Sequence, residues 1–464
     1  MNDLNAWSLD YANARAEALA GRGPAHADLN GSLATRFREA HAVVERRREE
    51  GVLGFMELPG RQDLVSAVQG LADGFGQWFE TVVVIGIGGS ALGALALRDA
   101  LLGPHWNERN VEARDYFPRL YFLDNPDPTV VADLLAVIEP TRTLFNVVSK
   151  SGSTAETMAL YLVVRKLLDD AVGPDAARGH FVFTTDPERG PLRTLAQEQG
   201  IPTLAVPGNV GGRFSVLSPV GLFPAALTGI DLRALMAGAA AMDERCRSTD
   251  LLANPAGLLA TLLHAWDTDH GTPIHVLMPY ANRLRSFALW FQQLWAESLG
   301  KEREGRGVGP TPLPAVGATD QHAQVQLFME GPLDKFVVFL AIHDFAETLT
   351  IPDVHPDIEA ARYLAGHTVA HLLDVERRAT TEALRQRGRP SCTLTLPALD
   401  TPSLGALFQL FEHATVLAGG LYGVDPLDQP GVELGKRLTY GLLGREGHEI
   451  EPLPPERADA CWKG

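Results

Sequence analysis

An alternation of short apolar runs with helical patterns constrains this chain more strongly than any other feature. From Thr81 onward, runs rich in β-branched residues are separated by stretches of helical periodicity. Such runs are typical of strands buried in a parallel sheet, because the helices between them cover both of its faces. The runs are T-V-V-V-I-G, R-L-Y-F-L-D, T-L-F-N-V-V-S and H-F-V-F-T-T, then T-P-I-H-V-L-M-P-Y, K-F-V-V-F-L-A-I and S-C-T-L-T-L-P.

The two sets of runs predict two α/β domains in tandem. The chain has 464 residues, which is enough for two or three domains of ordinary size. We expect a helical N-terminal segment at 1–58, a first domain at 59–230, a second domain at 231–420 and a C-terminal segment at 421–464. Each domain should hold a mostly parallel sheet flanked by helices.

The net charge limits the possible binding partners, and the cysteines indicate the cellular compartment. A formal charge of −17 argues against nucleic acid and anionic membranes, since both require a cationic surface, but it leaves room for one small anion. Cys246, Cys392 and Cys461 are far apart and form no C-x-x-C pair, which favours a reducing compartment. We find no secretory signal and no apolar run of the ~18 residues that a membrane span requires. We therefore expect a cytoplasmic protein.

The first candidate site is the glycine-rich turn within Val82–Gly93, V-V-V-I-G-I-G-G-S-A-L-G. Glycines let the backbone approach a ligand, and a helix beginning near Ser90 would direct N–H groups at an anion, which makes Gly89 and Ser90 candidate binding residues. The stretch also fits the relaxed dinucleotide pattern G-x-G-x-x-A. The acidic residue expected about 20 positions later appears only at Asp124. A nicotinamide-dependent dehydrogenase therefore remains a weak alternative.

The second candidate site is the hydroxyl-rich turn V-V-S-K-S-G-S-T-A-E-T, which follows a buried strand and precedes a helix. Simple N-capping would need only one of its five hydroxyl side chains, so the excess favours phosphate binding at the helix N-terminus. No P-loop motif is present, and a small phosphorylated molecule therefore fits better than a nucleoside triphosphate. The candidate residues are Ser149, Lys150, Ser151, Gly152, Ser153, Thr154 and Thr157.

An amphipathic helix at 284–299 carries a candidate carboxylate. Gln293 and Glu297 stand at i and i+4, so both can reach one ligand. Trp290 on the same, less apolar face suggests that this face lines something other than bulk water. A solvated glutamate near the helix end is the alternative reading.

Three further basic residues occur in turns or beside loops. Arg213 lies in G-G-R-F-S, His322 follows a long Gly/Pro-rich connection, and Lys436 follows the turn in D-Q-P-G-V-E-L-G-K. Each is weak evidence alone, because basic residues on turns are usually solvated. His367 and His371 have metal-like i, i+4 spacing, but they lack the glutamate of H-E-x-x-H and an evident third ligand.

Taken together, these motifs resemble the phosphoglucose isomerase family. The resemblance rests on G-I-G-G-S, S-K-S-G-S-T-A-E-T, G-G-R-F-S, Q-Q-L-W-A-E-S-L-G-K, G-A-T-D-Q-H and D-Q-P-G-V-E-L-G-K, in that order between Gly86 and Lys436. Two peripheral departures are Leu427, where the family often has an aromatic residue, and Gly208, where a polar residue is common. The resemblance implies two SIS-type sugar-isomerase domains and reversible conversion of glucose 6-phosphate to fructose 6-phosphate.

The resemblance also implies roles for single residues. Glu297 matches the family's base, Arg213 the group that faces the enediolate, and His322 and Lys436 the ring-opening groups. Gln293 and Gln429 match partners of the sugar hydroxyls. The family implies no metal or cofactor, and a homodimer in which His322 reaches the neighbouring subunit's site. A non-catalytic sugar-phosphate sensor and a dual enzyme that also accepts mannose 6-phosphate are the remaining alternatives.

Overall fold

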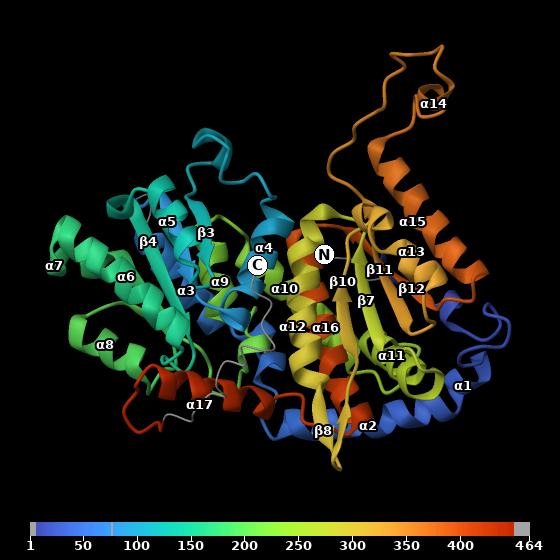
Figure 1. Ribbon diagram of the computed structural model, residues 1–464, viewed down its shortest axis with the longest axis horizontal. Helices are drawn as coiled ribbons and strands as arrows, with labels where there is room; N and C mark the ends of the chain where they lie inside the picture. Colours follow the sequence, from blue (N-terminus) through green and yellow to red (C-terminus); the bar gives the residue numbers. More distant parts are fainter. Residues whose placement is uncertain (1–5, 76–77, 450–464) are drawn as a thin grey trace, which may run out of the picture.

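The computed structural model describes residues 6–75 and 78–449 and consists of two α/β lobes side by side (Figure 1). Each lobe is built around one five-stranded sheet. All seven strands predicted from the sequence are present, which confirms the predicted fold class. The division at 59–230 and 231–420 remains our proposal for the domain boundaries.

The first sheet is entirely parallel and has the strand order β3-β2-β4-β5-β6. Its central strands are apolar and fully buried, because helices lie between successive strands in the chain and cover them. The strands are β2 (Thr81–Ile85), β3 (Arg119–Leu123), β4 (Thr143–Ser149), β5 (Phe181–Thr185) and β6 (Thr203–Ala205). The helices are α3 (Gln62–Phe75), α4 (Leu92–Leu101), α5 (Pro128–Val137), α6 (Ala155–Val172), α7 (Pro174–Ala177), α8 (Pro191–Gln199) and α9 (Pro219–Leu227).

The order of this sheet creates a topological switch point between β2 and β4. The chain leaves β2 toward β3 on one side and returns to β4 on the other. Ligands of open α/β sheets bind outside the carboxyl ends of the strands at such a point. The glycine-rich turn follows β2 and the hydroxyl-rich turn follows β4, so both candidate sites meet there.

The second sheet has the order β1-β12-β11-β7-β10 and is parallel except for β1. The sequence did not predict β1, a three-residue strand of the N-terminal segment that pairs Ser8 with Thr395. The Gly/Pro-rich connection also holds unpredicted strands, namely β10 and the β8–β9 hairpin. The strands are β1 (Ser8–Asp10), β7 (Ile274–Pro279), β8 (Lys301–Arg303), β9 (Arg306–Val308), β10 (Thr311–Pro314), β11 (Lys335–Asp344) and β12 (Ser391–Ala398).

Helix α16 (Thr401–Tyr422) forms the core of the second lobe. Aromatic side chains of α12 (Arg285–Leu299), among them Phe287 and Trp290, pack against Phe408 and Phe411 of α16. Helix α16 is long and apolar enough to cross a membrane, but 89% of its apolar window is buried inside the protein, as in a core helix. The other helices are α1 (His26–Asn30), α2 (Ser32–Glu49), α10 (Leu232–Cys246), α11 (Pro255–His270), α13 (Val325–Glu330), α14 (Glu359–Arg362) and α15 (Val369–Gln386).

Two segments leave the bodies of the lobes. After α16, the chain crosses to the first lobe, where α17 (Glu433–Leu442) runs beneath the sheet (Figure 1). Between β11 and α15, residues 345–368 with α14 project away from the second lobe (Figure 1).

Cys246 and Cys392 are buried and unpaired, whereas Cys461 lies outside the described residues.

Candidate active site

One cavity of about 660 Å³ collects most of the predicted site residues. It lies at the carboxyl ends of β2 and β4 and receives residues from both lobes and from the C-terminal segment. Its wall consists of Ile87, Gly89, Ser90, Lys150, Ser151, Thr154, Asp186, Arg189, Gly190, Gly208, Gly212, Arg213, Gln293, Glu297, Gln429 and Lys436. Of the predicted residues, Ser149, Gly152, Ser153, Thr157 and His322 are not part of this wall.

The glycine-rich turn after β2 is packed backbone to backbone against the loop that carries Arg213. A Cβ at Gly89 would lie 2.3 Å from the carbonyl oxygen of Gly212, so only glycine fits. The Ser215 hydroxyl ties the two loops together, because it lies within hydrogen-bond distance of the carbonyl oxygens of Gly89 and Gly212. The glycines of this turn therefore place Ser90 and Arg213 at the same cavity.

The hydroxyl-rich turn is braced from within. The Ser149 hydroxyl accepts from the backbone N–H of Gly152 at 3.1 Å and lies 3.0 Å from the Thr154 hydroxyl. Thr154 is the N-cap of α6, yet its side chain makes no capping hydrogen bond. The first-turn N–H groups of α6 are thus not used by a cap, which leaves them available for an anion. The Thr157 hydroxyl is buried and has no hydrogen-bond partner among the described residues.

Lys150 lines the cavity, but its ammonium is bound to backbone carbonyls of the protein. Its Nζ donates to the carbonyl oxygens of Gly208 and Val210, both at 2.7 Å. Burial lowers the pKa of Lys150, and the nearby Asp186 carboxylate opposes that shift. Lys150 therefore connects the hydroxyl-rich turn to the loop that leads to Arg213.

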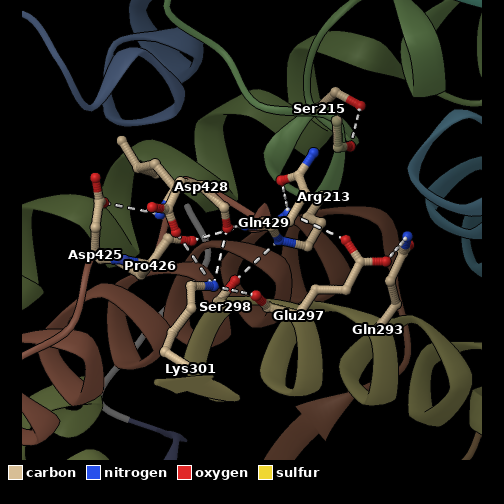
Figure 2. A network of polar contacts seen from close by, with 12 residues as sticks. Arg213, Ser215, Gln293, Glu297, Ser298, Lys301, Asp425, Pro426, Asp428 and Gln429 are labelled. Atoms are coloured by element: carbon tan, nitrogen blue, oxygen red, sulfur yellow. Dashed lines mark hydrogen bonds and ion pairs between the residues drawn. The ribbon is translucent and has the colours of Figure 1, made fainter. Parts of the chain in front are cut away.

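The carboxylate of Glu297 enters the cavity from the second lobe (Figure 2). Its Oε1 accepts from Nε2 of Gln293 at 3.0 Å, one helical turn earlier on α12, and its Oε2 accepts from Arg213 at 3.1 Å. The side chain is 35% exposed, so it is held in place and still accessible from the cavity. Trp290 does not share this environment: it is buried against Phe408, so the cavity-facing part of α12 begins at Gln293.

Arg213 is buried at the centre of the polar network in Figure 2, and its side chain is 5% exposed. Burial lowers the pKa of its guanidinium, an effect that the charge of Glu297 opposes. All five N–H donors have protein acceptors, which fixes a permanent positive charge beside the Glu297 carboxylate. The acceptors are the hydroxyl of Ser298, the side chains of Glu297 and Gln429, and the carbonyl oxygens of Pro426 and Asp428.

Lys301 anchors the turn that carries Gln429 to the end of α12 (Figure 2). Its Nζ donates to the carbonyl oxygens of Glu297 and Asp428, the latter at 2.9 Å. Burial lowers the pKa of Lys301, and the charge of Arg213 acts in the same direction. The sequence contained this lysine at the end of Q-Q-L-W-A-E-S-L-G-K, but its role depends on a turn more than a hundred residues later.

Lys436 and His322 have different relations to the cavity. Lys436 lines it from α17 and pairs with Glu433 at 2.7 Å. His322 lies in a 3₁₀ turn, Thr319–His322, on the second lobe, where its side chain is exposed. The neighbouring Gln321 fixes this turn by donating to the hydroxyl of Thr380 on α15. Within one chain, the structure therefore brings Lys436 to Glu297 but leaves His322 outside their cavity.

The cavity wall also contains residues that the sequence did not indicate. Asp186 and Arg189 follow β5, the strand next to β4, and so reach the same edge of the sheet. The sequence could have indicated these two residues, because both are polar and follow a predicted parallel strand.

The rings of His367 and His371, which have metal-like spacing in the sequence, stack at 5.1 Å outside this cavity. The described residues contain no group of three or more His, Cys, Asp or Glu side chains suited to a metal.

On the first lobe, an open helix N-terminus with hydroxyls and a buried arginine share one cavity with a carboxylate from α12 of the second lobe, an arrangement suited to a small anionic ligand. The sequence model described as phosphoglucose isomerase matches residues 65–448. The chain therefore belongs to the phosphoglucose isomerase family.

Individual relatives agree with this assignment. The chain is 43% identical to the glucose-6-phosphate isomerase of Carboxydothermus hydrogenoformans over 96% of both chains. It is 47% identical to that of Rubrobacter xylanophilus, with 85% of this chain and 90% of the relative covered. Among solved structures, a hypothetical protein from Thermus thermophilus has a TM-score of 0.84 at 40% identity, with 94% of this chain and 100% of that chain covered. A glucose-6-phosphate isomerase from Chlamydia trachomatis has a TM-score of 0.69 at 25% identity, with 88% and 78% covered.

Proposed function

We propose that the chain interconverts D-glucose 6-phosphate and D-fructose 6-phosphate, a step of glycolysis and gluconeogenesis, through an enediolate intermediate. The observation that carries the proposal is the position of Glu297 in the same cavity as the hydroxyl-rich turn. The phosphoryl group would bind at Ser90, Ser151, Thr154 and the N-terminus of α6. Held at that end, the open-chain sugar would present C1 and C2 to the carboxylate.

The chemistry requires one base that serves two adjacent carbons. Glu297 would remove the proton from C2 of the aldose, and the electron pair would form the C1=C2 bond of the enediolate. The protonated carboxyl would then return the proton to C1, while the hydroxyl proton of O2 passes to O1 and the carbonyl forms at C2. A carboxylate suits this exchange because it can accept and return a proton at neighbouring positions.

The positive charge of Arg213 would stabilise the enediolate. Its donors are already engaged by the protein, so it would act mainly as a fixed charge beside the base. Lys436 and His322 would open the sugar ring by moving protons to and from its oxygens. Gln293 and Gln429 would hold sugar hydroxyls. We assign no cofactor, since Arg213 supplies the charge that the intermediate needs.

We further propose that the active unit is a homodimer in which His322 completes the partner's cavity. Two observations support it. His322 is exposed and lies outside the cavity of its own chain. The projecting segment 345–368 also carries apolar side chains that are more than half exposed, as expected for a segment that packs on a second copy. These side chains are Leu349, Val354, Ile358 and Tyr363.

The hydroxyl-rich turn can be tested with the double variant Ser149→Ala, Thr154→Ala. We expect the KM for glucose 6-phosphate to rise about 100-fold, because two hydroxyls that brace or contact the phosphoryl group are lost. The measurement is steady-state kinetics. Thr35→Ala, which removes an exposed helix hydroxyl that is not part of the cavity wall, serves as the control. An unchanged KM in the double variant would remove this turn from substrate binding.

The reaction itself is tested by an assay that couples glucose 6-phosphate formation from fructose 6-phosphate to NADP⁺ reduction. We expect turnover without added metal, and its absence would refute the proposed reaction. A parallel assay with mannose 6-phosphate decides whether the pocket also accepts the other C2 configuration. A cytoplasmic location belongs to the same proposal, and the buried free thiols of Cys246 and Cys392 support it.

A further inference from the structure

The loop at Asp186–Gly190 is fixed against the hydroxyl-rich turn. The backbone N–H of Asp186 donates to the carbonyl oxygen of Lys150 at 3.3 Å. Gly190 has a φ of +103°, and a Cβ there would lie 2.6 Å from the carbonyl oxygen of Ser151. The backbone N–H of Arg189 donates to the Asp186 carboxylate at 3.1 Å. The backbone of Arg189 is therefore held at a set position beside the proposed phosphate site.

At this end of the cavity, a bound phosphate dianion would lie near the negative charge of Asp186 and would need a positive charge to offset it. The Asp186 carboxylate lines the wall, and its pKa is lowered chiefly by a hydrogen bond from the backbone of Glu188 and less by the charge of Arg189. Lys150 beside it already donates to two carbonyl oxygens. A dianion that bound only to hydroxyls and helix N–H groups would face a carboxylate without an uncommitted cation, which is unfavourable in a partly desolvated site.

Four cationic side chains line the cavity, and they differ in what they already bind. Arg213 has protein acceptors for all five donors, Lys150 binds backbone carbonyls and Lys436 pairs with Glu433. Within residues 6–75 and 78–449, the guanidinium of Arg189 has neither a hydrogen bond nor an ion pair. Of these four cations, Arg189 is therefore the one that can bind a ligand without giving up a contact to the protein.

We propose that Arg189 binds the phosphoryl group of the substrate and makes the cavity selective for phosphorylated sugars. The inference rests on the proposed function only for the identity of the substrate. The planar guanidinium offers two parallel N–H groups that match two phosphoryl oxygens. Arg189 lies at the end of the cavity formed by the hydroxyl-rich turn, so it contributes to binding rather than to proton transfer.

The test compares Arg189→Gln with the matched control Arg142→Gln. Arg142 is exposed, pairs with Glu80 and lies at the amino end of β4, the opposite end from Ser149. Titration calorimetry with inorganic phosphate measures anion binding without any turnover. We expect the phosphate Kd to rise about 10-fold or more in Arg189→Gln, with partial recovery in Arg189→Lys, and no change in Arg142→Gln.

Kinetics give a second, independent measurement. In Arg189→Gln the KM for glucose 6-phosphate should rise with the phosphate Kd, because a contact far from C1 and C2 stabilises substrate and transition state equally. An unchanged phosphate Kd, or a fall in kcat at constant KM, overturns the assignment while leaving the isomerase reaction intact. If the wild-type chain did not turn over the sugar at all, the calorimetric comparison would still decide the role of Arg189.

Discussion

Replacement of Glu297 by glutamine is expected to lower kcat roughly 10³- to 10⁴-fold, the range that a positioned general base contributes. The amide keeps the shape of the side chain and an oxygen for Arg213, but it cannot accept the C2 proton. Arg213 retains its four other acceptors, so its position should persist. The measurement is steady-state kinetics in both directions, with exchange of the C2 hydrogen with solvent as a direct reading of proton transfer.

Two further variants separate the base from charge and shape. Glu382→Gln makes the same substitution on α15, where it breaks an exposed ion pair with Arg385 and should leave kcat unchanged. Glu297→Asp keeps a carboxylate but shortens the side chain, so intermediate activity is expected. The KM should change little in Glu297→Gln, because the proposed phosphate site lies at the hydroxyl-rich turn and not at Glu297. Near-wild-type turnover of a folded Glu297→Gln enzyme would assign the base to another residue.

The part of the site built by local sequence could be predicted. The turns after β2 and β4 were each predicted to bind a ligand, and they meet in the structure because the carboxyl ends of neighbouring parallel strands lie at one edge of the sheet. Gln293 and Glu297 were paired because helical geometry brings i and i+4 to one face. In the structure Gln293 and Glu297 line the same cavity as the two turns, although neither rule predicts that α12 of the second lobe faces them.

The part built by distant contacts could not be predicted. Lys150 belongs to a phosphate-like motif, yet its ammonium binds carbonyls 58 and 60 residues later in the chain. Trp290 was predicted to lie on a ligand-facing surface, but Phe408 of α16 covers it. No pattern within the sequence of α12 indicates this contact with α16. Strand β1 pairs with a strand almost four hundred residues away, and three residues are too few to show a periodicity. Arg189 was missed because its proposed role follows from the contacts that the other cations of the cavity already make, and these contacts are not visible in the sequence.

The second prediction with a large expected effect on activity concerns His322. If the site is shared between subunits, as proposed, combining two inactive variant chains in one dimer can restore an intact site. His322→Ala should lower activity by roughly 10²-fold or more if this group assists ring opening. Glu297→Gln should be nearly inactive for a different reason. In the proposed homodimer, the two chains co-expressed with distinct tags would form mixed dimers in which one cavity has both defects and the other has neither. With random pairing, about one quarter of all sites are intact.

The expected result is therefore recovery of about one quarter of wild-type activity from two nearly inactive chains. Co-expression of Glu297→Gln with the double variant Glu297→Gln, His322→Ala is the matched control, since no pairing of those chains restores a base. If His322 acted within its own chain, each cavity of the mixed dimer would carry one defect and activity would stay near that of His322→Ala. Purification of the doubly tagged dimer sharpens the distinction, because half of its sites should then be active. The exposed position of His322, outside the cavity that holds Glu297, is what makes recovery the expected outcome.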